Sequence, residues 1–433
     1  MKKIFQYIML AVVTIVMASC TSDIEETTAT TGKNNVQLVV GEFPAFGDSQ
    51  TRAIGTPDAG KTSWAEGDEL LLEMTSKTLG TKYAAFKYNG SNWELASGEL
   101  SYKEDEVPTF PHVYYAPNYK WEAGKLVLKE GKAAGTDEYI EGKANITPNG
   151  QGINVSFTDA TRNYSRLRIA TMPNKQITVA INKYIPAGSS SMEWFQDIAL
   201  TSDEKGNAYL YGTFVRYFDF EVKYEGAPLA SHTFYQAAEN AKSYALDATV
   251  VSLADEGITY DQIVEDVKKE LDAGKTYINL MLAPDVDEET LEAIHIGLAG
   301  ASNGTINLTL IGCKKIPSGG FMYWKMLKSI ALPDVTEIAE KAFLDCTRLQ
   351  KVVLGNLTKV YGKAGEKGIF EGCRTKDIDL ILSKDQKVMN GGETEGGYCW
   401  TADIKDYCGS DEHNGRVFLD YDFQSITCGY PVP

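Results

Sequence analysis

The sequence predicts a mainly β protein, with two tandem β-sandwiches followed by a short α/β solenoid. Short segments in which apolar and polar residues alternate run from residue 36 to about residue 250, and turn residues separate them. Beyond residue 316, one apolar pattern recurs after 22 residues. The length of 433 residues, with 43% hydrophobic and 23% charged residues, fits several folded domains.

Residues 1–20 have the features of an export signal. Lys2 and Lys3 precede the apolar run Ile8–Met17, which is too short to span a bilayer, and Cys20 follows small residues. This stretch resembles the bacterial lipobox, which implies that Cys20 is acylated and becomes the new N-terminus. The alternative is an ordinary secretory signal with a chance cysteine at its end.

The Thr-rich residues 21–35 lack apolar periodicity and predict a tether. The acidic residues Asp23, Glu25 and Glu26 resemble the tag of Bacteroides-type lipoproteins that reach the outer face of the outer membrane, so we expect a lipid-anchored protein at the cell surface. The net charge of −17 and the lack of clustered Lys and Arg argue against a nucleic-acid partner.

Eight β segments are predicted between residues 36 and 250. They are Val36–Val40, Leu70–Leu72, Ala85–Tyr88, Val113–Tyr115, Ile153–Phe157, Leu167–Ile169, Ile177–Ile181 and Tyr217–Val222. A Gly-, Asn- and Pro-containing cluster at 147–152 divides the region into two parts of about 100 residues, the usual size of one sandwich. We therefore predict sandwiches over 36–148 and 149–252.

Five short motifs in this region are similar to the opening domain of the fimbrillin-like proteins. They are Thr51-Arg52-Ala53, Thr62–Trp64, Gly67–Glu69, Tyr88–Trp93 and Val113–Pro117. The resemblance implies transthyretin-like sandwiches that serve as pilus stalk, pilus tip or free-standing adhesin. It also implies that a protease can cut between Arg52 and Ala53 and remove Val36–Val40, whereas an ordinary loop at Arg52 is the alternative.

The periodicity changes after residue 250. Apolar residues at helical spacing over 260–271 follow a capping box from Thr259 to Gln262, and a second helical pattern covers 291–298. Alternating residues at 278–282 and 306–310 predict a strand beside each helix. The segment therefore reads as a repeated strand-and-helix unit.

A tighter repeat follows. Ile316–Leu332 superposes on Ile338–Leu354 with a constant offset of 22, and a third copy contains Val360, Phe370 and Cys373. The glycine-rich insert 362–368 lengthens that third copy. A period in the twenties is typical of leucine-rich repeats, in which each copy buries its apolar edge only against its neighbours.

The order Ile, Ala-Phe, Cys and Leu-x-x-Ile/Val-x-Leu, clearest at Ala342–Cys346, resembles the BspA-type leucine-rich repeat. The resemblance covers about 305–385 and implies a leucine-rich-repeat domain over 253–433, with caps at both ends. It also implies a surface protein that binds a host or bacterial protein or glycan.

Six cysteines follow Cys20. Cys313, Cys346 and Cys373 fall at repeat positions that we expect to be buried. Free cysteine suits such positions because it behaves as a small apolar residue. Cys399 and Cys408 lie close together in a loop-like stretch and form the candidate disulfide, which leaves Cys428 free.

Catalytic and metal-binding constellations are not evident. The histidines at 112, 232 and 295 lack ligand partners at metal-site spacing, and the acidic group Asp285–Glu289 fits a helix N-terminus better than a calcium loop. We expect no enzymatic activity, no cofactor and no metal.

Aromatic residues supply the candidate partner contacts. The repeat register predicts that Phe321 and Trp324 are interior and that Tyr323 is exposed, and Tyr398 and Trp400 join Tyr323 as candidates. The leading hypothesis is an adhesin that binds a protein or glycan through the repeat domain and meets the membrane only through its lipid. The alternatives are a tip or accessory pilus subunit assembled by donor-strand exchange with other subunits, and a glycan-capture lipoprotein.

Overall fold

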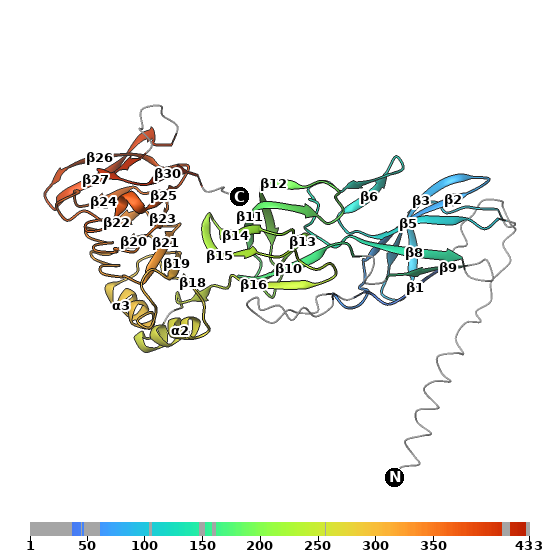
Figure 1. The fold of residues 1–433 in the computed structure, drawn as a ribbon, viewed down its shortest axis with the longest axis horizontal. Helices are drawn as coiled ribbons and strands as arrows, with labels where there is room; N and C mark the ends of the chain where they lie inside the picture. The colour runs from blue at the N-terminus through green and yellow to red at the C-terminus, as the bar shows by residue number, and fades with distance from the viewer. Residues whose placement is uncertain are drawn as a thin grey trace, which may run out of the picture.

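The structure is a computed structural model that describes residues 37–44, 46, 61–103, 106–146, 152–157, 162–255, 257–408 and 416–429. These residues form a mainly β molecule with an elongated shape (Figure 1). Two β-rich units and a stack of parallel strands follow one another along the long axis, with the stack at one end and the first unit at the other. Among the described residues, no helix is long and apolar enough to cross a membrane.

The first unit is built on a seven-stranded sheet with the order β1-β9-β8-β5-β2-β3-β4. Its core contains Leu70, Leu72, Phe86 and Val113 from the predicted strands. A separate hairpin, β6 and β7, lies beside it. The strands are β1 Gln37–Val40, β2 Glu69–Ser76, β3 Gly80–Tyr88, β4 Trp93–Gly98, β5 Thr109–Tyr115, β6 Tyr119–Glu122, β7 Lys125–Leu128, β8 Ile140–Ile146 and β9 Gly152–Ser156.

The division predicted at residue 148 is wrong by one strand. β9 pairs antiparallel with β8 and parallel with β1, so it belongs to the first unit. The glycine- and asparagine-containing segment at 147–152 therefore connects two strands of one sheet. The second unit begins after Phe157.

The second unit is barrel-like because β11 is shared between two groups of strands. Residues 176–184 of β11 pair with β12 and β14, whereas Ile185 and Pro186 pair with β13. The main path of the sheet is β15-β14-β11-β13-β10-β16. The strands are β10 Ser165–Ala170, β11 Gln176–Pro186, β12 Glu193–Thr201, β13 Asn207–Thr213, β14 Phe218–Tyr224, β15 Ala227–Phe234 and β16 Ser243–Asp247.

A buried ionic cluster joins the two units. The Arg162 side chain is fully buried, and its guanidinium pairs with Glu138 at 3.3 Å, donates to the Pro44 carbonyl and lies 4.0 Å from the centre of the Phe46 ring. The Tyr164 hydroxyl also donates to Glu138, at 2.6 Å. Arg162 thus holds the segment that follows β1 against the start of the second unit.

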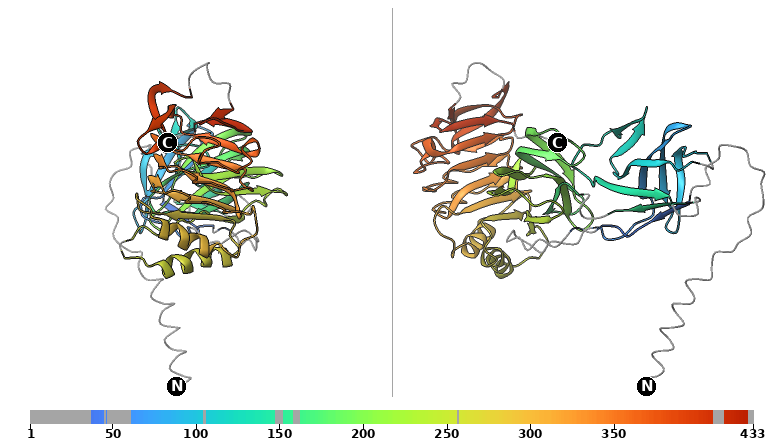
Figure 2. Two further views of the ribbon diagram at one scale, coloured as in Figure 1. Left: turned by 90° about the vertical axis from the view of Figure 1, so that its left-hand side faces the viewer. Right: turned by 45° about the vertical axis from the view of Figure 1, so that its right-hand side comes forward.

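The stack contains two facing sheets, which we call the inner and outer sheets. The inner sheet has the order β17-β18-β19-β21-β23-β25-β30, and the outer sheet has the order β20-β22-β24-β27-β26. The inner sheet faces the second unit, and the outer sheet points away from it (Figures 1 and 2). The inner strands are all parallel: β17 Val251–Ser252, β18 Tyr277–Met281, β19 Ile306–Ile311, β21 Leu327–Leu332, β23 Lys351–Leu354, β25 Asp379–Leu382 and β30 Ser425–Cys428.

The outer sheet and the remaining elements complete the stack. The outer strands are β20 Lys315–Ile316, β22 Glu337–Ile338, β24 Lys359–Tyr361, β26 Lys387–Thr394 and β27 Gly397–Asp406. The helices are α2 Tyr260–Asp272, α3 Glu288–Gly297 and the short η2 Thr375–Asp377, and a small hairpin joins β28 Val417–Phe418 to β29 Tyr421–Asp422. The predicted capping box at Thr259 and Gln262 is confirmed, and Asp287 caps α3 through the Thr290 amide at 2.8 Å.

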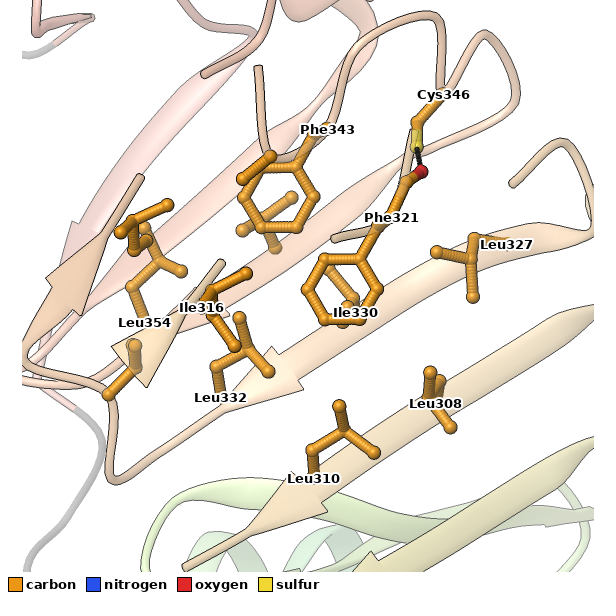
Figure 3. Packing of buried hydrophobic residues seen from close by; sticks show 14 of the residues in the cluster. Leu308, Leu310, Ile316, Phe321, Leu327, Ile330, Leu332, Phe343, Cys346 and Leu354 are labelled. Atoms are coloured by element: carbon orange, nitrogen blue, oxygen red, sulfur yellow. Dashed lines mark hydrogen bonds between the residues drawn. The ribbon is translucent and has the colours of Figure 1, made fainter. Parts of the chain in front are cut away.

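The 22-residue offset places equivalent side chains on top of one another. Phe321 stacks on Phe343 with ring centres 5.3 Å apart (Figure 3), and Phe343 stacks on Phe370 at 5.1 Å. The buried Cys346 thiol donates to the Phe321 carbonyl at 3.0 Å, and the Cys373 thiol donates to the Phe343 carbonyl at 2.9 Å. Each copy therefore completes both the packing and the hydrogen bonding of its predecessor.

Candidate binding surface

The second unit covers the inner sheet. Strand β15 lies against β18, β19 and β21, where the Asn279 side-chain amide donates to the Leu229 carbonyl at 2.9 Å. The Thr309 hydroxyl donates to the Pro228 carbonyl at 2.7 Å, and Lys351 pairs with Glu221 at 3.1 Å. These bonds occupy the outward-facing residues of the inner strands.

Apolar contacts complete this junction. Ala227 at the start of β15 packs against Ala331 and Val353, with Ile381 at the border of the group. These three stack residues lie on β21, β23 and β25 and alternate with the residues that point into the stack core. The covered part of the inner sheet is an intramolecular interface and is not accessible to another molecule.

The glycine-rich insert at 362–368 forms a compact turn. The amide of Lys363 donates to the Glu366 carbonyl at 3.1 Å, and the amide of Glu366 donates back to the Lys363 carbonyl at 2.8 Å. A Cβ on Gly362, whose φ is 88°, would lie 2.1 Å from the Lys367 carbonyl oxygen, and one on Gly368 would lie 2.0 Å from the Tyr421 hydroxyl. Only glycine fits such close approaches, so these glycines serve the turn.

Only one of the three predicted contact residues is clearly exposed. The Tyr323 side chain is 52% exposed, Tyr398 is half-buried, and Trp400 is buried at 8%. The interpretation of Trp400 as a contact residue is wrong, because it lies opposite Val360 in the outer sheet, points into the stack core and donates from its indole Nε1 to the Gly362 carbonyl at 3.0 Å. Phe321 and Trp324 are buried, as the repeat register predicts.

The outer sheet presents charged and aromatic side chains. Lys315 lies 3.9 Å from Glu337 on the neighbouring strand, and the ammonium group of Lys359 lies 4.7 Å from the centre of the Tyr361 ring. The hairpin of β26 and β27 extends this sheet, and its Ile404 side chain is 90% exposed. A single exposed apolar side chain is common on folded proteins, so Ile404 alone does not mark a contact surface.

The predicted disulfide between Cys399 and Cys408 is wrong. Cys408 is bonded to Cys428, while Cys399 is a buried free cysteine. Cys399 lies in the middle of β27, and β30 returns along the inner sheet to bring Cys428 to Cys408. The short sequence separation between Cys399 and Cys408 was therefore a misleading basis for the predicted disulfide.

The free thiols and imidazoles have structural surroundings. Burial raises the pKa of Cys313 and of Cys373 to about 12, so both thiols stay protonated at neutral pH and are weak nucleophiles. Burial lowers the pKa of His295, whose ring stacks on Trp324 with centres 4.9 Å apart. Among the described residues, no group of His, Cys, Asp and Glu is arranged to hold a metal ion.

Cys20, Arg52 and Ala53 lie outside the described residues. The segments before and after the Arg52 position are described in part: β1 is an edge strand that pairs with β9, and Phe43 and Phe46 are buried. β1 can therefore leave the first unit only if the buried Phe43 and Phe46 are displaced.

Two exposed groups were missed by the sequence analysis. Trp194 and Phe195 on β12 are 54% and 81% exposed, and the stack gathers Lys and Arg side chains that are scattered along the chain. Residues 305–387 contain 14 Lys and Arg against 9 Asp and Glu, a net charge of +5 in a chain of −17. Counting charge by segment reveals this asymmetry, which the total charge hides.

The chain matches no protein-family model and no curated protein. One similar solved structure is a candidate cell adhesion protein from Bacteroides fragilis, which is 10% identical. The match covers 50% of this chain and 93% of that chain, with a TM-score of 0.24. A score at this level carries no argument about fold or function.

Proposed function

We propose that this protein is a non-enzymatic cell-surface lipoprotein that acts as an adhesin, with a leucine-rich-repeat solenoid over the stack as its binding domain. Two transthyretin-like β-sandwiches would act as a stalk, and acylated Cys20 would attach the chain to the outer membrane. The observation that carries the proposal is the docking of β15 on the inner sheet, which leaves the outer sheet pointing away from the stalk. The partner would be a host or bacterial protein or glycan.

The adhesin proposal can be tested by blocking separate faces of the intact protein. Beads coated with the chain that starts at Cys20 are incubated with host cells, extracellular matrix and neighbouring bacteria. Fabs against the outer sheet and against the turns that lead from it to the inner strands are expected to abolish capture, and a Fab against β2 and β3 of the first unit serves as the matched control. The proposal is contradicted if capture is equal with the stack Fabs and with the control Fab. It is also contradicted if the coated beads capture no more than beads without protein.

The lipid anchor has its own test. Cells grown with an alkyne fatty acid are expected to label the wild-type chain and not Cys20→Ala. Trypsin added to intact cells is expected to degrade the labelled protein if it lies on the outer face. Label retained in Cys20→Ala, or complete protection in intact cells that is lost on lysis, contradicts the anchored surface location.

A tip or accessory pilus subunit is the second candidate, and the position of β1 favours it. β1 is a four-residue edge strand that pairs only with β9 among the described strands, so a donor strand could replace it. Release of the segment that contains β1 is opposed by two features. Phe43 and Phe46 are buried, and the Arg162 guanidinium donates to the Pro44 carbonyl. The proposal therefore requires that a cut at Arg52 be followed by active displacement.

Native chromatography after treatment with an arginine-specific protease separates the two candidates. An anchored adhesin is expected to resist the protease or to keep the cleaved 20–52 segment, which contains β1, bound without changing its size. A pilus subunit is expected to lose that segment and appear in larger assemblies that start at Ala53. The glycan-capture alternative is weakened, because its expected platform of Tyr323, Tyr398 and Trp400 loses the buried Trp400.

A further inference from the structure

Four of the 14 Lys and Arg residues in 305–387 lie at the edge where the inner strands begin. Lys325 and Lys328 precede and open β21, and Arg348 and Arg374 occupy the turns before β23 and β25. All four side chains are exposed. We call these four residues the basic strip.

Backbone contacts place the members of the basic strip side by side. The amide of Gly304 donates to the Lys325 carbonyl at 2.9 Å, and a Cβ on Gly304 would lie 3.2 Å from the Arg348 Cβ. The amide of Gln350, two residues after Arg348, donates to the Lys328 carbonyl at 2.8 Å. Lys325 and Arg348 therefore flank the same loop, and Lys328 lies on the strand next to Gln350.

Arg374 extends the strip by one more copy. Lys325 directly follows Trp324, and Arg374 directly follows Cys373, which holds the equivalent position in the third copy. Neighbouring strands lie about 4.8 Å apart, so cations on β21, β23 and β25 span on the order of 10 Å across the edge. A row of this length suits an extended polyanion better than a single small ion.

The basic strip lacks acidic partners within the described part of the chain. Other lysines of the stack form ion pairs: Lys314 with Asp334 at 3.4 Å, Lys367 with Glu340 at 3.5 Å and Lys376 with Asp422 at 3.7 Å. None of the four strip residues has such a pair among the described residues. Their charge is therefore available to an external anion.

Neutral and aromatic groups border the basic strip. Tyr323 has φ 67° and is held in place by its amide, which donates to the Leu344 carbonyl at 2.8 Å, while its ring stays 52% exposed. Thr347 and Gln350 add a hydroxyl and an amide that can both donate and accept hydrogen bonds. Cations, an exposed ring and neutral hydrogen-bonding groups together match a ligand that carries anions, apolar ring faces and hydroxyls.

We infer that the basic strip with Tyr323 binds a linear anionic glycan that bears sulfate or uronate groups. This inference rests on the proposed adhesin function and names its partner class. Arg348 and Arg374 can each bind a sulfate or carboxylate through two parallel N–H donors, Lys325 and Lys328 add point charges, and the Tyr323 ring can cover an apolar sugar face. Acidic peptides and nucleic acids offer anions without this combination.

Binding to immobilised heparin tests the inference, with the full chain from Cys20 as analyte. The variant Lys325→Glu/Lys328→Glu/Arg348→Glu is expected to lose at least about tenfold in affinity at 0.15 M salt, where exposed charges still act over roughly 8 Å. The matched control Lys143→Glu/Lys205→Glu/Lys268→Glu changes the net charge equally at three exposed, dispersed sites and is expected to change affinity less than about twofold. The milder Lys328→Gln/Arg348→Gln variant covers the case in which charge reversal disturbs folding.

Four competitors identify the ligand class. Heparin and a carboxylated glycan such as hyaluronan are expected to compete, whereas poly-glutamate and duplex DNA of equal charge are expected to compete at least about tenfold less, because Tyr323, Thr347 and Gln350 find no sugar to contact. Tyr323→Ala is expected to weaken the binding of the glycans and to leave the weaker binding of poly-glutamate and DNA unchanged. Equal competition by poly-glutamate or DNA, or equal loss in both triple variants, overturns the inference.

The same assay keeps the two proposals apart. If heparin does not bind while a Fab against the stack still blocks cell capture, the glycan inference fails and the adhesin proposal stands. If heparin binds through the strip while no cell or matrix is captured, the adhesin proposal fails.

Discussion

At the scale of single residues, Arg162 makes the sharpest prediction. We expect Arg162→Leu to lower the free energy of unfolding of the two β-units by about 3–5 kcal/mol, because it leaves Glu138 buried without its cation. Urea denaturation followed by tryptophan fluorescence measures this loss. Arg374→Leu removes an exposed arginine and is expected to change stability by less than about 0.5 kcal/mol.

The pH dependence of the Arg162→Leu loss identifies its cause. Burial raises the pKa of Glu138 in the folded protein, and Arg162 opposes that rise. Without Arg162, the folded state binds a proton at Glu138 more tightly than the unfolded state does, so the variant gains stability as pH falls through the folded pKa. A loss that is equal at pH 5 and pH 8 would contradict the uncompensated carboxylate as the cause.

The bond between Cys408 and Cys428 gives a second prediction at this scale. Closing a loop between cysteines 20 residues apart stabilises the folded state by about 2–4 kcal/mol, so dithiothreitol should destabilise the wild type and leave Cys428→Ser unchanged. Non-reducing peptide mapping should show Cys408 linked to Cys428 and Cys399 alkylated only after denaturation. A peptide that links Cys399 to Cys408 would refute the assignment.

At the scale of elements, the phenylalanine stack explains why the repeat needs all its copies. Phe343 contacts both Phe321 and Phe370 and has no exposed surface. We expect Phe343→Ala to cost about 3–5 kcal/mol and Phe343→Leu clearly less, measured by the denaturation of the stack. Phe195→Ala, at an 81% exposed ring, is the control, and an equal loss in both would mean that the stack contributes no special stability.

Predictability from sequence also differs between elements. The stack was predictable because buried parallel strands and their turns recur with a constant offset, and the phenylalanine pairs confirm that register. The β26–β27 hairpin was not predictable, since Gly391 and Gly392 interrupt its alternation and tertiary pairing with β24 supplies the stability. β12 was missed for a related reason: Trp194 and Phe195 point to solvent, so no alternation marks the strand.

At the scale of the whole molecule, the junction at β15 sets the direction of the stack. We expect Glu221→Lys to speed amide exchange in β15, because it replaces the attraction to Lys351 with repulsion, and the double variant Glu221→Lys/Lys351→Glu to restore protection. The partly exposed pair is worth about 1 kcal/mol or less. Lys315→Glu, on the outer sheet, should leave exchange in β15 unchanged, and faster exchange there would contradict a local effect.

The site was the least predictable level. Tyr323 could be placed on the surface from the register alone, whereas Trp400 could not be excluded before β27 was seen to pair with β24. The basic strip depends on residues that are 20 or more positions apart becoming neighbours through the stacking of copies, as with Lys325 and Arg348. Sequence proximity carries no information about that kind of neighbourhood.

The docking of β15 also bears on how such a protein can diverge. β15 contacts β18, β19 and β21, its Ala227 packs against Val353 on β23 with Ile381 of β25 at the border, and β30 follows β25 at the end of the inner sheet. Duplication of one coding unit after β25 would add a whole turn without disturbing the junction, and the insert in the third copy shows that turns tolerate length changes. Unequal recombination could thus lengthen the stack in a lineage while the two β-units stay unchanged.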